Sequence, residues 1–274
     1  MLLPLRDDNK CLHTPYVTYA LLAVNVAIMV WLTMLSPQEQ RVEVVEHGFI
    51  PARMAQLSNP QLVVDVPLEP EQTVLRRGRR AVVEQAPREI LRLPAAPTVI
   101  LSTILTTMFL HGGWLHLAGN MWFLWIFGNN VEDRLGSWLY LVFYLVGGVL
   151  ATSCHWAYDP RSVTPVIGAS GAVATVLGAY AVTFPAASVR TLVFIGLVTV
   201  IDIPAIVWLG LWLAGQLVDA VFVGDLAVAV WAHIGGFAAG ALLMPILTFG
   251  MPPHGTSWDD EIKKQFSFPP PEGR

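Results

Sequence analysis

The side chains that could do chemistry are few, and they lie in three separate apolar stretches of the chain. The conspicuous ones are Ser170, His233, His116 and Asn120. A histidine held next to a serine can take the hydroxyl proton and turn the oxygen into a nucleophile. An asparagine amide, a histidine ring N–H and the N–H groups at a helix start can stabilise the oxyanion that results. Together these residue types predict acyl transfer, with peptide hydrolysis as one form of it.

Composition places these residues in a membrane. Of the 274 residues, 54% are hydrophobic and 13% are charged, whereas soluble domains carry about 25% charged residues. An integral membrane protein is therefore expected, and disordered chains and basic nucleic-acid binders are excluded. The formal net charge of −4 gives no attraction to phosphates, so no nucleic-acid partner is expected. The two cysteines form neither a disulfide scaffold nor a CxxC zinc pair.

Six membrane spans are expected, because a bilayer core of about 30 Å needs roughly 20 apolar residues per helix. The stretch 190–201 is too short to cross and rich in Val, Ile and Thr, which favours a strand-like or interfacial segment. The predicted fold class is thus an all-α membrane protein, a six-helix bundle in residues 16–250 with a long extramembrane first loop at 36–100. Residues 1–15 form an N-terminal segment and residues 251–274 a flexible Pro-rich tail. The expected spans are 16–35, 114–127, 137–156, 165–184, 204–222 and 226–249.

The distribution of basic residues predicts the orientation. Loops longer than about 60 residues translocate largely regardless of their charge, so the loop 36–100 is left out of the comparison. With six spans, the remaining cationic residues on the side of the termini are Arg6, Lys10, Arg134, Arg190, Lys263, Lys264 and Arg274, against Arg161 alone on the other side. Both termini are therefore expected to be cytoplasmic, in a multi-pass protein of the plasma (inner) membrane.

Six spans also bring the polar residues to one depth, because the second, fourth and sixth helices run in the same direction. Counted from helix starts at 165 and 226, Ser170 and His233 lie roughly 8 and 11 Å below the same membrane face at 1.5 Å per residue. His116 and Asn120 are four residues apart and share a helix face. No Asp or Glu stands in these helices to orient the histidine, so a Ser-His dyad is expected rather than a triad. Close helix approach is expected at the small residues Gly168, Gly171, Gly236 and Gly240.

Each of these residues also has a structural interpretation. A serine in an apolar helix usually bonds the carbonyl one turn back, and a lone membrane histidine is more often an interhelical hydrogen-bond partner. A metal site at His111 and His116 is disfavoured, because a spacing of five residues places them about 140° apart around a helix. No metal and no cofactor are expected.

The motifs around these residues resemble the rhomboid family of intramembrane serine proteases over most of the chain. The second expected span contains HxxxN as His116 to Asn120, and the fourth contains GxSGx as residues 168–172. The last span contains AHxxG as residues 232–236. Residues 132–136 read Glu-Asp-Arg-Leu-Gly and match the family's signature after its second helix.

This resemblance implies cleavage of transmembrane segments of other membrane proteins. It implies Ser170 as nucleophile, His233 as general base and acid, and His116, Asn120 and the Ser170 amide as oxyanion donors. It also implies a six-helix core and a first loop partly embedded in lipid. Two departures stand out: many members carry a Trp-Arg pair where this chain reads Leu-Thr-Thr-Met-Phe-Leu at 105–110, and some carry a tyrosine where it has Ala174.

Two classes of function remain open at this point. One is an intramembrane serine endopeptidase acting on single-span or other transmembrane substrates. The alternative is a catalytically inactive rhomboid-like helix binder or a small transporter that uses the same polar cavity. Retention of both Ser170 and His233 favours the protease, and the lack of a second half resembling the first argues against repeat-built transporters.

Overall fold

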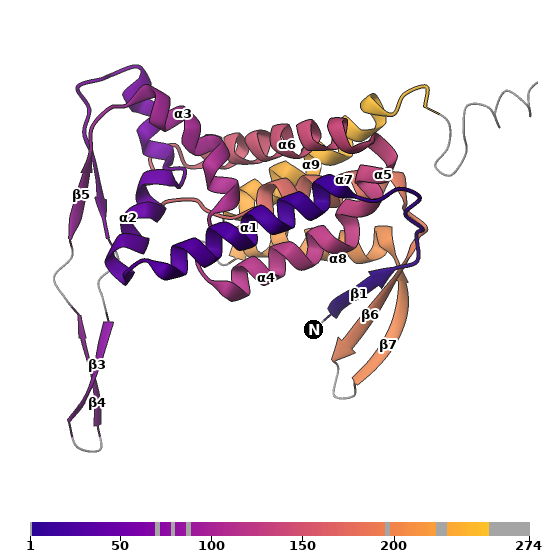
Figure 1. The fold of residues 1–274 in the computed structure, drawn as a ribbon, viewed down its shortest axis with the longest axis horizontal. Coiled ribbons are helices and arrows are strands. Elements are labelled where there is room, and N and C mark those ends of the chain that lie inside the picture. The colour runs from indigo at the N-terminus through magenta and orange to yellow at the C-terminus, as the bar shows by residue number, and fades with distance from the viewer. Residues whose placement is uncertain are drawn as a thin grey trace, which may run out of the picture.

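The computed structural model describes residues 2–68, 72–77, 80–85, 89–194, 198–222 and 229–251, with only the backbone described at 72–77 and 80–85. Most of its helices lie side by side along the longest axis of the molecule (Figure 1). They are α1 (Tyr16–Met34), α4 (Trp114–Phe123), α6 (Ser137–Tyr158), α7 (Ser170–Thr183), α8 (Ala205–Phe222) and α9 (Val230–Leu247). Helix α4 continues through a π-helical turn at Leu124–Gly128 into α5 (Asn129–Leu135).

The helical membrane bundle is confirmed, whereas the expected count of six spans is not. Within the described residues, α1, α6, α8 and α9 are long and apolar enough to cross a bilayer. A fifth span results if the bent pair 97–109 and 114–135, which meet at 79°, is counted as one. Helix α7 has only 14 residues, because the segment expected to begin it at residue 165 is not helical as far as Ala169.

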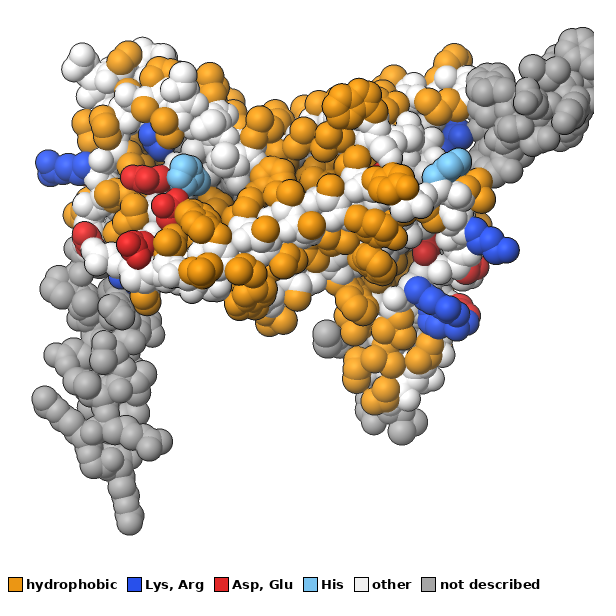
Figure 2. Space-filling model, in the orientation of Figure 1, with side chains coloured by type: hydrophobic (Ala, Val, Ile, Leu, Met, Phe, Trp, Pro, Cys, Tyr) orange, Lys and Arg blue, Asp and Glu red, His pale blue; other side chains and the backbone are white. Residues whose placement is uncertain are grey.

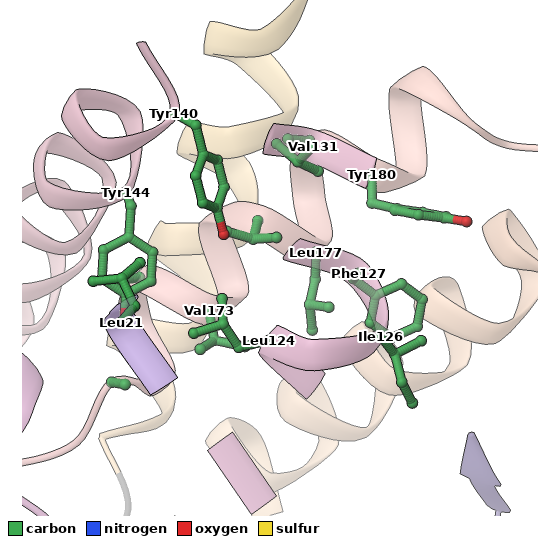
Figure 3. Close-up of a cluster of buried hydrophobic side chains, with 14 of the residues drawn as sticks. Leu21, Leu124, Ile126, Phe127, Val131, Tyr140, Tyr144, Val173, Leu177 and Tyr180 are labelled. Atoms are coloured by element: carbon green, nitrogen blue, oxygen red, sulfur yellow. The ribbon is translucent and has the colours of Figure 1, made fainter. Parts of the chain in front are cut away.

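Helix α7 forms the centre of the bundle. All of its residues from 171 to 181 are buried, which is the expected pattern for a helix surrounded by other helices. Around it pack aromatic and aliphatic side chains from α6 and from the α4–α5 region, among them Phe127, Tyr140 and Tyr144 (Figure 3). Tyr180 also belongs to this core, and its hydroxyl donates to the carboxylate of Asp7 in the N-terminal segment.

A buried carboxylate fixes the start of α1. Pro15 precedes this helix and provides no side-chain cap, so the first N–H groups need another acceptor. Glu132 from α5 accepts from the N–H of Val17 at 2.9 Å and from the N–H of Thr18 at 2.7 Å. It also accepts from the hydroxyls of Thr18 and Ser137. The segment 132–136 therefore connects α1, α5 and α6 through the hydrogen bonds of Glu132.

A three-stranded antiparallel sheet lies at the end of the bundle where α1 begins. It has the order β1 (Leu2–Asp7), β6 (Ser188–Phe194), β7 (Val198–Pro204). The strand-like segment expected at 190–201 is thus confirmed, and its Arg190 pairs with Asp202 at 3.1 Å. Strand β1 pairs with residues more than 180 positions later in the sequence; Leu2, for example, faces Val193 of β6. Hydrophobic side chains cover much of this sheet (Figure 2).

The first loop folds into a small subdomain at the other end of the bundle (Figure 1). It begins with α2 (Pro37–His47), started by a Ser36–Glu39 capping box, and a 3-10 helix at Pro51–Leu57. Strands β2 (Val64–Pro67) and β5 (Ile90–Leu93) pair over a core that includes Val45, Ile50 and Val66. A β3 (Gln72–Arg77) and β4 (Arg80–Gln85) hairpin follows β2, and α3 (Pro97–Thr106) with a 3-10 turn at Thr107–Phe109 leads back to α4.

The expected flexible tail falls almost wholly at 252–274, outside the described residues.

The first prediction concerns Asp7, whose carboxylate accepts from Tyr180 at 2.5 Å and from Asn130 at 2.7 Å. Burial raises the pKa of Asp7 from 3.8 to about 6, against the hydrogen bond from Tyr180, which lowers it. The folded state therefore binds the Asp7 proton more tightly than the unfolded state, so stability falls as the pH rises from about 4 to about 6. In Asp7→Asn this contribution is absent, and the melting temperature in detergent should decline less between pH 4.5 and 7. Parallel pH curves for wild type and variant would contradict it.

Candidate functional site

A single cavity of about 560 Å³ collects the four sequence-predicted residues. Ser170 comes from α7, His233 from α9, and His116 and Asn120 from α4. Helix α8 supplies Trp212 and Gln216, and the segment before α7 supplies residues 162 and 164–167. The chain therefore places these side chains, which are up to 117 residues apart in sequence, around one space.

Ser170 is the first residue of α7, and it was expected five residues into a helix beginning at Pro165. That expected depth is wrong because Gly168 has a φ of 123°, a conformation that right-handed helices exclude and glycine tolerates. A side chain at this glycine would also lie 2.8 Å from the His116 ring. Because the helix begins only at Ser170, the N–H groups of its first turn have no carbonyl one turn earlier to bond. They are therefore available next to the serine.

The segment 162–168, here called the pre-serine segment, is held by the first-loop subdomain. Phe49 and Val166 form an antiparallel bridge with hydrogen bonds of 3.1 and 2.8 Å. The Ala52 N–H donates to the Ser162 carbonyl at 2.9 Å, and the Thr107 hydroxyl donates to the Val166 carbonyl. The Gly168 N–H donates to the Thr107 carbonyl at 2.9 Å. The subdomain and the 3-10 turn at Thr107–Phe109 thus fix the extended backbone that leads into Ser170.

Helices α7 and α9 approach each other through glycines. Side chains built at Gly236 and Gly240 would overlap the backbone carbonyls of Gly171 and Thr175. One built at Gly171 would lie 3.7 Å from the Ala232 Cβ and 2.8 Å from the Ala151 Cβ of α6. Residues 171 and 232 follow and precede Ser170 and His233 directly, so this contact brings together the helix segments that carry the two candidate residues. Both line the cavity, and within the described residues no hydrogen bond joins them, since Nε2 of His233 has no partner. Gly168 is not part of this contact, since it precedes the helix, and its expected role in helix packing is corrected.

His233 is 8% exposed and is the fourth residue of α9. Its Nδ1 lies 2.6 Å from the Oε1 of Gln216 on α8. Its Nε2 has no hydrogen-bond partner among the described residues. Sequence analysis had no role for Gln216, although an amide inside the apolar stretch 204–222 is the kind of signal that marks a site. Ala174, where some relatives have a tyrosine, is fully buried, and the ring near His233 is Trp212 of α8, with centroids 6.1 Å apart.

The candidate oxyanion residues of α4 are ordered by local bonds. The Asn120 amide donates to the His116 carbonyl at 3.2 Å, and the Gly112 N–H donates to the His116 Nδ1 at 3.4 Å. With Nδ1 accepting, the ring proton of His116 sits on Nε2, the nitrogen next to Gly168. His111 accepts from the Ala169 N–H at 3.4 Å and supports the turn before Ser170. The part of the chain that the structure describes contains no group of three or more His, Cys, Asp or Glu able to hold a metal ion.

Comparison with known proteins finds one family. The rhomboid domain matches residues 100–249. The rhomboid protease GluP of Bacillus subtilis (strain 168) is 34% identical over 147 residues, 52% of this chain and 26% of GluP. Rhomboid-like protein 11, chloroplastic, of Arabidopsis thaliana is 44% identical over 68 residues, 25% of this chain and 24% of that protein. The presenilin-associated rhomboid-like protein A, mitochondrial, of Danio rerio is 34% identical over 96 residues, 34% of this chain and 25% of that protein. The matches thus span about a quarter of the length of each relative.

The second prediction tests the contact between α7 and α9. In Gly240→Ala the new methyl group overlaps the Thr175 carbonyl, so we expect a loss of about 1–3 kcal/mol or more, the usual range for overpacking. The matched control is Gly210→Ala in α8, where nothing lies within 4 Å of the added carbon and alanine improves helix propensity. Thermal unfolding in micelles should separate the two variants. Equal melting temperatures would show that the two backbones do not meet at this point.

Proposed function

This chain belongs to the rhomboid family, and from that premise we propose that it is an active intramembrane serine endopeptidase using a Ser170–His233 dyad. Family membership supports intramembrane proteolysis in general. The observation that carries the proposal for this chain is that Ser170 shares one cavity with a histidine whose Nε2 has no hydrogen-bond partner in the described part of the chain. A ring nitrogen without another bond can accept the serine hydroxyl proton.

The proposed reaction uses groups that line the cavity. Nε2 of His233 takes the Ser170 hydroxyl proton while Oγ attacks the carbonyl carbon of the scissile peptide. The tetrahedral intermediate then collapses, and the same Nε2 gives the proton to the departing amine. Water enters next, gives a proton to Nε2 and attacks the acyl-serine ester. The Oγ–C bond then breaks, Nε2 returns the proton to Ser170 Oγ, and the new carboxyl end is released. Each turnover consumes one water molecule and needs no metal or cofactor.

Three sets of donors support an oxyanion at this place. The N–H groups at the start of α7, that of Ser170 included, point out of the helix at its positive end. His116 presents a ring N–H, and Asn120 presents an amide from one turn farther along α4. Ser170, His116 and Asn120 all line the same cavity, and the backbone N–H groups belong to the first turn of α7.

The surroundings of the cavity favour a transmembrane segment as substrate. Its lining includes residues of both α4 and α8, and these two helices expose apolar side chains such as Leu115 and Val221. The pre-serine segment uses the N–H and C=O of Val166 for its bridge to Phe49. Alternation along an extended chain turns those of Ile167 to the opposite edge, where an unwound substrate strand would find partners. Substrate and surrounding lipid are the expected partners.

We further propose that both termini lie on the cytoplasmic side of a plasma (inner) membrane, with the first-loop subdomain and the cavity opening on the other side. The basic residues of the short loops support this orientation. In the alternative function, an inactive helix binder or small transporter, Ser170 and His233 would have no chemical role.

The third prediction tests the dyad directly. Ser170→Ala and His233→Ala should each abolish cleavage of a single-span model substrate in proteoliposomes, because each removes a group that forms or breaks a bond. Both variants should keep the melting temperature of the wild type to within a few degrees. A fluorophosphonate probe should label the wild type and not Ser170→Ala. Cleavage by either folded variant, or labelling that persists without Ser170, would refute the dyad.

The fourth prediction concerns the oxyanion donors. Asn120→Ala should lower kcat by about 10–10³-fold, the range for removal of one oxyanion donor. Asn25→Ala is a suitable control, since Asn25 is a buried asparagine on α1 whose amide also bonds the carbonyl four residues earlier. If the two variants have equal kcat, Asn120 is a packing residue and the oxyanion role passes to His116 and the α7 N–H groups.

A further inference from the structure

The imidazole of His233 is held from a helix that takes no part in the family motifs. Gln216 lies near the middle of α8, and its Oε1 is 2.6 Å from Nδ1 of His233. The contact is short for a hydrogen bond between neutral groups. It lies on the opposite side of the ring from Nε2, the nitrogen without a partner among the described residues.

Hydrogen-bond chemistry at this contact determines which ring nitrogen carries the proton. A carboxamide oxygen only accepts, so a nitrogen bonded to it must carry hydrogen. With hydrogen on Nδ1, a neutral imidazole has its lone pair on Nε2. That is the nitrogen a general base needs to present to Ser170. The opposite tautomer would leave the Gln216 oxygen facing a lone pair and Nε2 already protonated.

We propose that Gln216 is a positioning residue, which holds His233 as the Nδ1–H tautomer with Nε2 directed at the Ser170 hydroxyl. This inference rests on the proposed function and adds a third member to the dyad, an amide in place of a carboxylate. Such an acceptor orients the ring without placing a charge in the bundle, and a central charge would cost about 2.5–3.5 kcal/mol.

The hydrogen bond between Gln216 and His233 also depends on the position of α8. The buried residues of α8 are Ala205, Trp208 and Leu209, all within its first five positions. Gln216 lies beyond them, in the part of the helix whose residues 212, 216 and 220 line the cavity. Displacement of that part away from α9 would break the bond to Nδ1 and release the ring. The tautomer of the base therefore depends on whether α8 is packed against α9.

Two substitutions at one position test the proposal. Gln216→Met removes the acceptor at similar length, and Gln216→Glu keeps it and adds a charge. Leu217→Met, at an exposed neighbour on the same helix, controls for methionine in α8. We expect Gln216→Met to lower kcat by about 10–100-fold, in the lower range for loss of general-base function, with little change in KM. Gln216→Glu should retain most activity, with the acid limb of its kcat/KM profile moved to higher pH, since a nearby carboxylate favours the imidazolium.

A spectroscopic readout is independent of activity. In full-length protein labelled with ¹⁵N-histidine in micelles, the His233 nitrogens should report Nδ1–H in the wild type and in Leu217→Met, and a mixture of tautomers in Gln216→Met. Nε2–H in the wild type, or the same tautomer in Gln216→Met, would overturn the proposal. The other titratable groups acting on His233 are His116 and His155, and their spectra serve as internal references. If the wild type shows no serine reactivity, the protease assignment fails, while the tautomer still decides the role of Gln216.

Discussion

The arrangement of the site depends on the direct contact of two helix backbones. Helix α9 meets α7 where Gly236 and Gly240 face the carbonyls of Gly171 and Thr175. In lipid there is no hydrophobic driving force between helices, so dense packing between small residues carries much of the association. The same contact determines the separation of residues 170 and 233, since Gly171 and Ala232 are their chain neighbours. A bundle with larger residues along this line would hold the two backbones, and with them residues 170 and 233, farther apart.

The rest of the molecule secures the two ends of that helix pair. At one end, the first-loop subdomain bonds the pre-serine segment through Phe49 and Ala52, so the turn into α7 is fixed before any ligand arrives. At the other end, Glu132 joins α1 to α5 and α6, and Tyr180 of α7 bonds Asp7. The centre of the bundle is therefore anchored on both sides, whereas most of α8 is exposed. An anchored serine segment beside a helix with few buried residues is compatible with the proposed entry of a transmembrane substrate.

Much of this arrangement follows from the sequence, and the exceptions have physical reasons. Apolar runs predicted most of the membrane helices, and the Val- and Ile-rich stretch 190–201 predicted a strand-like segment where the structure has β6 and β7. The start of α7 was misplaced because hydropathy continues smoothly through residues 165–169, while Gly168 and the bridge to Phe49 keep them extended. The role of Gln216 was missed because it depends on the rotation of α8 relative to α9, which no local pattern encodes. For residues 36–100 the sequence predicts a loop or a small extramembrane subdomain, but not its helix and strands, because the apolar positions of 36–68 are interrupted by proline.

The edge strand β1 has a consequence for biogenesis. Its partner strand β6 ends at Phe194, so a ribosome must complete some 190 residues, most of the bundle among them, before the two can pair. At roughly 5–20 residues per second, the early segment waits on the order of ten seconds or more without its sheet. Throughout that interval its backbone groups and those of any neighbouring nascent chain are open to mispairing. This sheet can therefore close only after α1 to α7 have been synthesised, and until then the edge of β1 stays without its partner strand.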